Sequence, residues 1–165
     1  MLPVKTILHP TDFSHYSEFA FQLAHSLARD YGAKLIVLHT FSPPAMMAFE
    51  GMEVDWGTPE KEIAMLDHKL HQVAVPGSQV KMEHRLVEGF AAEAILQAAE
   101  ESKADMIVMG THGRTGFNRL LMGSVAEEVL RKAACPVLTV KAPATEEVED
   151  NADAKVGIEA FVPAI

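Results

Sequence analysis

Four glycines and one serine follow a short apolar run, Met106–Met109, in the second half of the sequence. They are Gly110, Gly113, Gly116, Gly123 and Ser124. Glycine lets a backbone turn sharply and approach a ligand closely, because it carries no Cβ atom. The helical pattern that begins at Ser124 adds unpaired N–H groups and the positive end of a helix dipole. Together with the Ser124 hydroxyl and the Arg114 cation, these features favour the binding of an oligophosphate.

Two familiar nucleotide-binding motifs do not match this stretch. A Walker A loop needs a Lys after its last glycine, and no Lys follows any of these glycines in that register. The dinucleotide fingerprint GxGxxG belongs after the first strand, where the sequence reads HPTDFS (His9–Ser14). The SGGxDS-type loop of adenylating and ATP-pyrophosphatase enzymes would also lie there and is absent. Such an enzyme is therefore the weaker interpretation.

Alternating strand and helix patterns predict the scaffold that positions these residues. The predicted strands are Lys5–Pro10, Lys34–Phe41, Val80–Glu88, Ala104–Met109 and Cys135–Lys141. The predicted helices are Ser14–Tyr31, a segment beginning at Thr58-Pro59-Glu60, Ala91–Ser102 and Ser124–Ala133. Strands separated by helices favour a doubly wound, parallel α/β sheet, in which ligands bind beyond the carboxyl ends of the strands.

Three finer expectations concern the faces of these elements. Residues of the Val80–Glu88 strand alternate between apolar and polar types, so this strand should lie near a sheet edge. In the first helix, the stripe that contains Leu23 and Tyr31 should face the core. In the second helix, the stripe from Ile63 to Val73 should do the same.

The glycine stretch and its flanking strands resemble the ATP-binding branch of the universal stress protein family. That branch carries G-x2-G-x9-G-[ST], and Gly110, Gly113, Gly123 and Ser124 have this spacing. The resemblance runs from Lys5 to Lys141 and includes the segments ILHPTDFS, LIVLHTF, ADMIVMGTHGRTG and CPVLTVK. It implies a single Rossmann-like domain with five parallel strands in the order 3-2-1-4-5.

The resemblance also implies a site for ATP, with AMP and ADP as alternative ligands. Met109 would lie beside the adenine, and Thr40 would offer it backbone polar groups. Asp12 would bond a ribose hydroxyl or face Mg²⁺ or Mn²⁺ held by the phosphates, and its competing role is to cap the following helix. His112 would shape the glycine loop or contact phosphate. The expected ATP-binding residues are Pro10, Thr11, Asp12, Thr40, Met109, Gly110, His112, Gly113, Arg114, Gly123, Ser124 and Val125.

The function that this resemblance implies is nucleotide-dependent regulation in a stress response. Fast hydrolysis needs a positioned base and stabilisation of charge at the γ-phosphate. Only Asp12, His112 and Arg114 are near the expected site, and none is a clear water-positioning group. A slow ATPase or autophosphorylating enzyme of the same fold is the alternative, and a scaffold without nucleotide is a third. The family further implies a homodimer through Cys135–Lys141, and the sequence does not name the protein partner.

Composition limits the remaining function classes. The formal net charge of −9 argues against non-specific nucleic-acid binding, which needs a basic face. No apolar run approaches the roughly 18 residues of a membrane span, and MLPVKTILHP does not resemble a signal peptide. The single cysteine, Cys135, fits a reducing compartment. We therefore expect a cytoplasmic protein that does not insert into membranes.

The domain is expected to span residues 1–141, and residues 142–165 to form an acidic tail. The tail has one Lys and six acids, which are Glu146, Glu147, Glu149, Asp150, Asp153 and Glu159. It shows neither a helical nor a strand pattern before its last residues, GIEAFVPAI. We expect a flexible segment that serves solubility or partner recruitment.

Five further reactive residues are expected to be structural. His9 and His39 lie in apolar strands and should be core or sheet-end histidines with satisfied hydrogen bonds. His68 and His71 share one helix face, but no third metal ligand has a fixed spacing to them. Cys135 precedes an apolar strand and should be an inert core residue.

Overall fold

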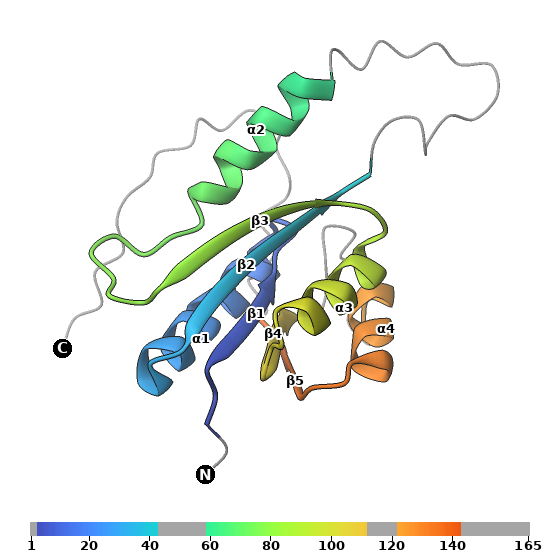
Figure 1. Cartoon of the computed structure of the whole chain (residues 1–165). Coiled ribbons are helices and arrows are strands. Elements are labelled where there is room, and N and C mark those ends of the chain that lie inside the picture. Colours follow the sequence, from blue (N-terminus) through green and yellow to red (C-terminus); the bar gives the residue numbers. More distant parts are fainter. Residues whose placement is uncertain (1–2, 43–58, 112–121, 143–165) are drawn as a thin grey trace.

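The chain forms a five-stranded sheet with helices on both faces (Figure 1). This computed structural model describes residues 3–42, 59–111 and 122–142. The elements in chain order are β1 (Thr6–Pro10), α1 (His15–Tyr31), β2 (Lys34–Phe41), α2 (Pro59–His71), β3 (Met82–Glu88), α3 (Ala91–Glu101), β4 (Met106–Gly110), α4 (Ser124–Lys132) and β5 (Val137–Val140). Each strand and helix predicted from the sequence pattern is confirmed.

All neighbouring strands are parallel, in the order β3-β2-β1-β4-β5. This confirms the doubly wound fold and the strand order implied by the family resemblance. β3 is an edge strand and is only partly buried along its length, as its alternating sequence predicted. Because every connection between paired strands contains a helix, both faces of the sheet are covered.

Two apolar clusters lie on opposite faces of the sheet. Leu8 packs in one cluster with residues of α3 and α4, and its neighbour Ile7 packs in the other with residues of α1 and with Leu70 of α2. Figure 1 shows α3 and α4 on one side of the sheet and α1 on the other. Successive strand residues point to opposite faces, so a strand that is covered on both faces needs an uninterrupted apolar run.

The inward faces of α1 and α2 match the expected stripes in part, because Ala20, Ala24 and Ala28 of α1 and Leu70 of α2 are buried as predicted. In α1, Leu23 and Tyr31 are 37% and 45% exposed, while Ser17 and Phe21 are buried. The expectation was wrong at both exposed positions because the buried stripe passes through a serine, which an apolar pattern does not detect. In α2, Ile63 is also 37% exposed.

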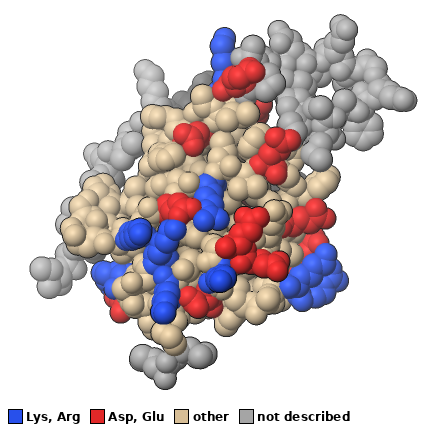
Figure 2. Space-filling model, viewed as in Figure 1, with Lys and Arg blue, Asp and Glu red and all other residues tan. Residues whose placement is uncertain are grey.

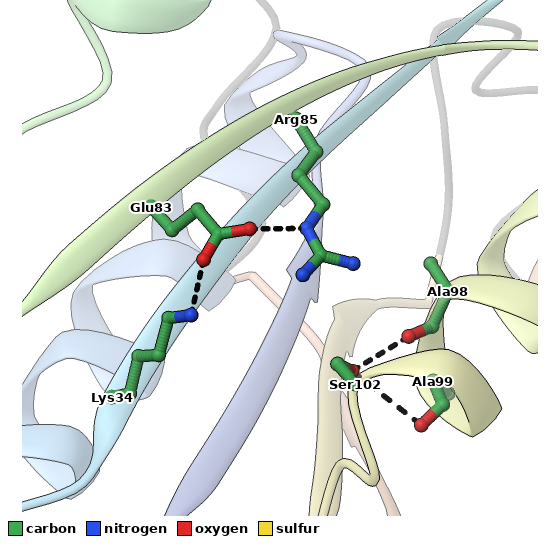
Figure 3. A network of polar contacts seen from close by, with 6 residues as sticks. All are labelled: Lys34, Glu83, Arg85, Ala98, Ala99 and Ser102. Carbon is green, nitrogen blue, oxygen red and sulfur yellow. Dashed lines mark hydrogen bonds and ion pairs between the residues drawn. The ribbon is translucent and has the colours of Figure 1, made fainter.

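The β2–β3 side of the sheet carries an ion-pair network (Figure 3). Glu83 of β3 accepts from Lys34 of β2 and from Arg85, two residues further along β3. The Lys34 ammonium and then the Arg85 guanidinium hold the pKa of Glu83 below its usual value. Figure 2 shows Lys and Arg side chains interspersed with Asp and Glu side chains over this face of the molecule. Charged side chains on an edge strand disfavour pairing with another sheet.

Candidate functional site

The backbone pairing of β1 with β4 ends before their carboxyl ends, while each strand stays paired on its other side. The β1–β4 pairing ends where Leu8 faces Ile107. β1 continues beside β2, and the Thr11 N–H donates to the Leu38 carbonyl oxygen at 2.8 Å. β4 stays paired with β5 as far as Gly110. The pairing therefore ends at the point where the strand order reverses, and the crevice at such a point is where ligands bind in doubly wound sheets.

A cavity of about 170 Å³ lies in this crevice. The cavity is lined by nine of the residues expected to bind ATP: Pro10, Thr11, Asp12, Thr40, Met109, Gly110, Gly123, Ser124 and Val125. The other three, His112, Gly113 and Arg114, lie outside the described residues. The structure thus brings together residues from three separate parts of the sequence.

Six further lining residues were missed by the sequence analysis. They are Ser17, Leu38, Ala91, Ile95, Thr111 and Ala126. Leu38 belongs to an apolar run, and an apolar pattern cannot distinguish core residues from those that line a cavity. Ala91 and Ile95 start the helix that follows β3, so the rule that ligands bind beyond strand carboxyl ends could have found them.

The turn after β1 forms the first wall, and its polar groups are satisfied within the wall. One Asp12 carboxylate oxygen accepts from the Ser14 N–H at 3.0 Å and from the Ser14 hydroxyl at 2.6 Å. The Ser14 hydroxyl oxygen in turn accepts from the Ser17 N–H at 3.3 Å, which caps α1. Asp12 therefore supports the start of α1, the competing role named above, and also lines the cavity.

The two other hydroxyl groups of this wall are also engaged. The Ser17 hydroxyl donates to the Ser14 carbonyl oxygen at 2.9 Å. Its contact of 3.0 Å with the Thr11 hydroxyl therefore has Thr11 as the donor. The Thr11 hydroxyl oxygen also accepts from the Phe13 N–H at 3.1 Å. These bonds fix the turn before any ligand arrives.

Phe13 adopts a left-handed backbone conformation within this turn, with φ of 63°. This conformation is uncommon for a bulky residue and costs free energy. The Phe13 ring packs against the His39 ring, with centroids 4.2 Å apart. The Lys69 ammonium lies 4.5 Å from the same ring centroid. These contacts offset the backbone cost and hold the turn in place.

Two buried histidines bind backbone carbonyl oxygens beside the crevice. His39 Nδ1 lies 2.7 Å from the backbone carbonyl oxygen of Thr11, and His9 Nδ1 lies 2.9 Å from that of Val108. Because a carbonyl only accepts, Nδ1 carries the proton in both rings. Burial lowers the pKa of His9 to about 4, although the Val108 carbonyl and the Asp12 charge oppose this shift. The expected burial of both histidines is confirmed, but the expectation that their hydrogen bonds are satisfied is wrong for His9, whose Nε2 has no partner among the described residues. His9 is neutral near pH 7.

The start of α4 forms the second wall, and its N–H groups lack internal acceptors. The N-cap residue is Gly123, and among the described residues no side chain caps this helix. The first intrahelical bond runs from the Glu127 N–H to the Gly123 oxygen at 2.9 Å. The N–H groups of Ser124, Val125 and Ala126 therefore have no acceptor within the helix. All three residues line the cavity.

Gly123, at the N-cap of α4, matters for the space that it leaves at the cavity. Its backbone conformation does not require a glycine. Gly123 has φ of −62° and ψ of 146°, which any residue can adopt. A side chain at this position would lie at the cavity beside the free N–H groups. The combination is that of an anion site at a helix N-terminus.

Comparison with known proteins identifies the family. The model of the Universal stress protein family matches residues 3–141. The chain belongs to the universal stress protein family.

Individual relatives agree with this assignment. Universal stress protein MJ0531 of Methanocaldococcus jannaschii is 38% identical over 145 residues, which cover 86% of this chain and 85% of that protein. The solved structure of protein MJ0577 from the same organism is 30% identical, with a TM-score of 0.67 over 87% of this chain and 100% of that one. A universal stress protein solved in complex with cAMP is 27% identical, with a TM-score of 0.63 over 84% of this chain and 98% of that one.

The described residues offer a metal ion one carboxylate at the site. They contain no group of three His, Cys, Asp or Glu residues that could hold a metal ion. Asp12 is the single charged residue among those that line the cavity within the described ranges. Mg²⁺ is often held by one or two carboxylates and the phosphates of a ligand. The residues therefore fit a metal ion that arrives with a nucleotide.

Other reactive residues of this family member lie away from the cavity. Cys135 is partly buried, and burial is the main cause that raises the pKa of its thiol. The thiol is therefore protonated at neutral pH, which supports the expected inert role. His71 Nδ1 lies 3.5 Å from a carboxylate oxygen of Asp67 on an exposed face of α2. No described helix is long and apolar enough to cross a membrane.

Proposed function

We propose that this universal stress protein binds an adenine nucleotide in the β1–β4 crevice and acts as a nucleotide-dependent regulator in a stress response. The observation that carries the proposal is the uncapped start of α4, where the three residues whose N–H groups have no acceptor within the helix all line the cavity. A phosphate group would accept from these N–H groups and gain from the helix dipole. The relative solved with cAMP supports an adenine nucleotide as the ligand.

The lining residues also indicate how the nucleotide would lie. Leu38, Ile95 and Met109 provide apolar surface at the cavity, which suits the adenine ring. Thr40, at the carboxyl end of β2, would offer backbone polar groups to the base. The ribose would then lie between the base and the start of α4, within reach of Asp12.

We further propose ATP as the nucleotide, with Mg²⁺ or Mn²⁺ bound between its phosphates and Asp12. The described lining residues include no cation that could balance a triphosphate. A metal ion would supply that charge, and Arg114 and His112 would add to it from the glycine loop. AMP and ADP carry less negative charge, so they would need less positive charge from a metal ion. A stronger dependence of binding on the metal ion would therefore indicate ATP.

The site favours binding over catalysis. Its only described titratable lining residue is Asp12, whose carboxylate already accepts two hydrogen bonds from Ser14. A general base must reach the attacking water, and this geometry does not present one. We expect turnover well below the roughly 1–10³ s⁻¹ of ordinary enzymes. A steady-state rate above about 1 s⁻¹ would instead indicate the ATPase alternative.

We also propose that the protein is a cytoplasmic homodimer that pairs through β5. β5 lies at the sheet edge and pairs with β4 on one side. Its central residue Leu138 is 38% exposed, which leaves apolar surface at this edge. Backbone pairing between two β5 strands would satisfy both edges. A separate protein partner would respond to the nucleotide state.

Two measurements test the proposed function. Mass spectrometry of the denatured purified protein should detect a co-purified adenine nucleotide. Calorimetric titration of the nucleotide-free protein with ATP should then give an affinity that Gly113→Val lowers at least about 100-fold. Gly116→Val is the matched control, because Gly116 lies in the same loop at a position that the motif leaves variable. Equal affinities of folded wild-type and Gly113→Val proteins would contradict the proposal.

A further inference from the structure

A proline interrupts the backbone ladder between β1 and β4 beside the crevice. The strands pair with Leu8 opposite Ile107, so continuing the register places His9 opposite Val108. In a parallel ladder, the next bond to the Val108 carbonyl comes from the N–H of residue 10. Residue 10 is Pro10, which has no N–H. The ladder therefore cannot supply a donor to this carbonyl, which belongs to a fully buried residue.

The neighbouring side chain supplies the missing donor. His9 Nδ1 lies 2.9 Å from the Val108 oxygen, and the imidazole is fully buried. The other ring nitrogen, Nε2, has no hydrogen-bond partner among the described residues. The nearest aromatic ring is that of Phe21, with centroids 5.7 Å apart. An unpaired buried acceptor is unfavourable, so an apolar residue would suit this core position better unless the Nδ1–H is needed.

This bond joins the two strands that border the cavity, β1 and β4. His9 directly precedes Pro10 and Thr11, and Val108 directly precedes Met109 and Gly110. A backbone bond at this level would hold the strands at the usual spacing of about 4.8 Å. A bond from a side chain tolerates a wider separation, so the strands can diverge while the carbonyl stays paired.

We propose that His9 is a positioning residue of this cavity. Its imidazole N–H replaces the backbone N–H that Pro10 lacks, and it ties β1 to β4 without closing the crevice between them. The first part of this inference, that the imidazole N–H replaces the backbone N–H, is independent of any ligand. The second part, that this bond keeps the crevice open for its ligand, rests on the proposed nucleotide function.

His39 provides an internal control for this inference. Its Nδ1 also donates to a backbone carbonyl, that of Thr11, at 2.7 Å. However, His39 lies on β2, and the β1–β2 register there continues to Pro10 opposite Leu38. A donor restored at residue 10 faces Val108 and not Thr11. Pro10→Ala should therefore compensate for the loss of His9 but not for the loss of His39.

The test is a double-mutant cycle with two readouts. Urea unfolding without nucleotide measures how much the His9–Val108 bond stabilises the fold. Calorimetric titration with ATP measures the affinity of the crevice for its ligand. His9→Leu should lower the urea midpoint and weaken ATP binding about tenfold. His9→Asn, whose amide nitrogen can occupy the position of Nδ1, should retain ATP affinity within about threefold.

The double variant distinguishes the effect of the bond on stability from its effect on the crevice. Adding Pro10→Ala to His9→Leu should restore most of the urea midpoint, because the backbone N–H regained at residue 10 can then pair with Val108. It should not restore ATP affinity, because a backbone bond draws the strands together. If His9→Leu alone does not fold, the double variant still should. The same Pro10→Ala change in a His39→Leu background should give additive losses.

Other outcomes overturn the inference. Additive effects of His9→Leu and Pro10→Ala on the urea midpoint, or a double variant that stays unfolded, would show that the imidazole does not replace the N–H. Full ATP affinity in His9→Leu would refute the positioning role. If the wild-type protein binds no adenine nucleotide, the proposed function and the positioning role both fail, and the urea cycle alone decides the first part of the inference.

Discussion

The two walls of the crevice satisfy their hydrogen bonds in opposite ways. At the start of α1, the Ser14 side chain caps the helix and Asp12 fixes Ser14. At the start of α4, Gly123 offers no side chain, and the residues that carry the first N–H groups line the cavity. The first wall is complete without a ligand, and the second is not. Binding capacity at this site is therefore expected where the fold leaves donors unpaired.

An uncapped helix start is not sufficient by itself. The N-cap residue of α3, Phe90, also makes no side-chain hydrogen bond to the helix. Phe90 is 60% exposed, so water can reach that helix start. The start of α4 differs because all three residues without an acceptor inside the helix, Ser124, Val125 and Ala126, line the cavity, whereas α3 contributes Ala91 alone from its corresponding residues.

The largest expected effect is a loss of stability in acid, caused by His9 of β1, the strand that leads into the first wall. Burial lowers the pKa of His9 from 6.5 to about 4, so the unfolded chain takes up a proton before the folded one does. Stability is therefore full above pH 6.5 and falls as the pH drops towards 4. The full loss is on the order of 3 kcal/mol. Urea unfolding without nucleotide, measured between pH 7.5 and about 4.5, checks this.

The comparison of His9→Asn with wild type isolates this effect. Asn does not titrate, so its stability should fall less over the same pH range. His25, whose pKa is lowered by partial burial and then by Arg29, titrates in the same direction and is present in both proteins. Parallel pH profiles of the two proteins would show that His9 does not cause the acid sensitivity.

The next largest effect breaks the second wall by capping it. In Gly123→Asp, the new carboxylate should accept from the free N–H groups and repel phosphate. ATP affinity should fall about 100-fold, or roughly 2.7 kcal/mol. Stability without nucleotide should stay equal or rise by up to about 1 kcal/mol, because Asp is a favourable N-cap residue. Calorimetric titration and urea unfolding measure the two quantities.

Gly123→Ser is the matched control for this change. It adds a neutral cap of similar size, so its effect on ATP affinity should be clearly smaller. Equal losses in the Ser and Asp variants would mean that the lost space is the cause and the added charge is not.

A smaller effect separates the two roles of Asp12. Asn at this position retains the oxygen that accepts from Ser14 and removes the charge. Asp12→Asn should therefore weaken ATP binding about tenfold in the presence of Mg²⁺. In EDTA, the wild-type and variant affinities should be similar. A loss of equal size with and without Mg²⁺ would assign Asp12 to the ribose and not to the metal ion.

Removing the cap of the first wall should affect stability more than binding. Ser14→Ala deletes the oxygen that accepts from the Ser17 N–H. Such a change typically costs about 1 kcal/mol. ATP affinity should change by less than about threefold, because Ser14 is not among the residues that line the cavity. A larger loss of affinity would show that the turn also orients the ligand.

The smallest effect concerns the acidic tail. Ala142 is buried, so the chain should be truncated after it. Deleting residues 143–165 should leave the domain folded and ATP affinity within about threefold. Circular dichroism and titration check these outcomes. Release of bound nucleotide on truncation would instead make the tail part of the site.

Sequence patterns predicted the fold well because β1, β2 and β4 have continuous apolar runs and helical patterns separate the strands. The cavity could be placed because the motif lies between a strand and a helix. The exposure of Leu23 and the burial of Ser17 could not be predicted, since a serine in the core depends on a tertiary hydrogen bond. The His9–Val108 bond also escaped, because it depends on the register of β1 against β4 at a proline.

The most direct test of the central claim follows backbone amides by NMR during titration with ATP and Mg²⁺. We expect the largest shifts for the amides of Ser124, Val125 and Ala126, which have no acceptor within α4. The Ser17 amide, already bonded to Ser14, should shift much less. Binding that shifts Ser17 and leaves the three α4 amides unchanged would contradict the account.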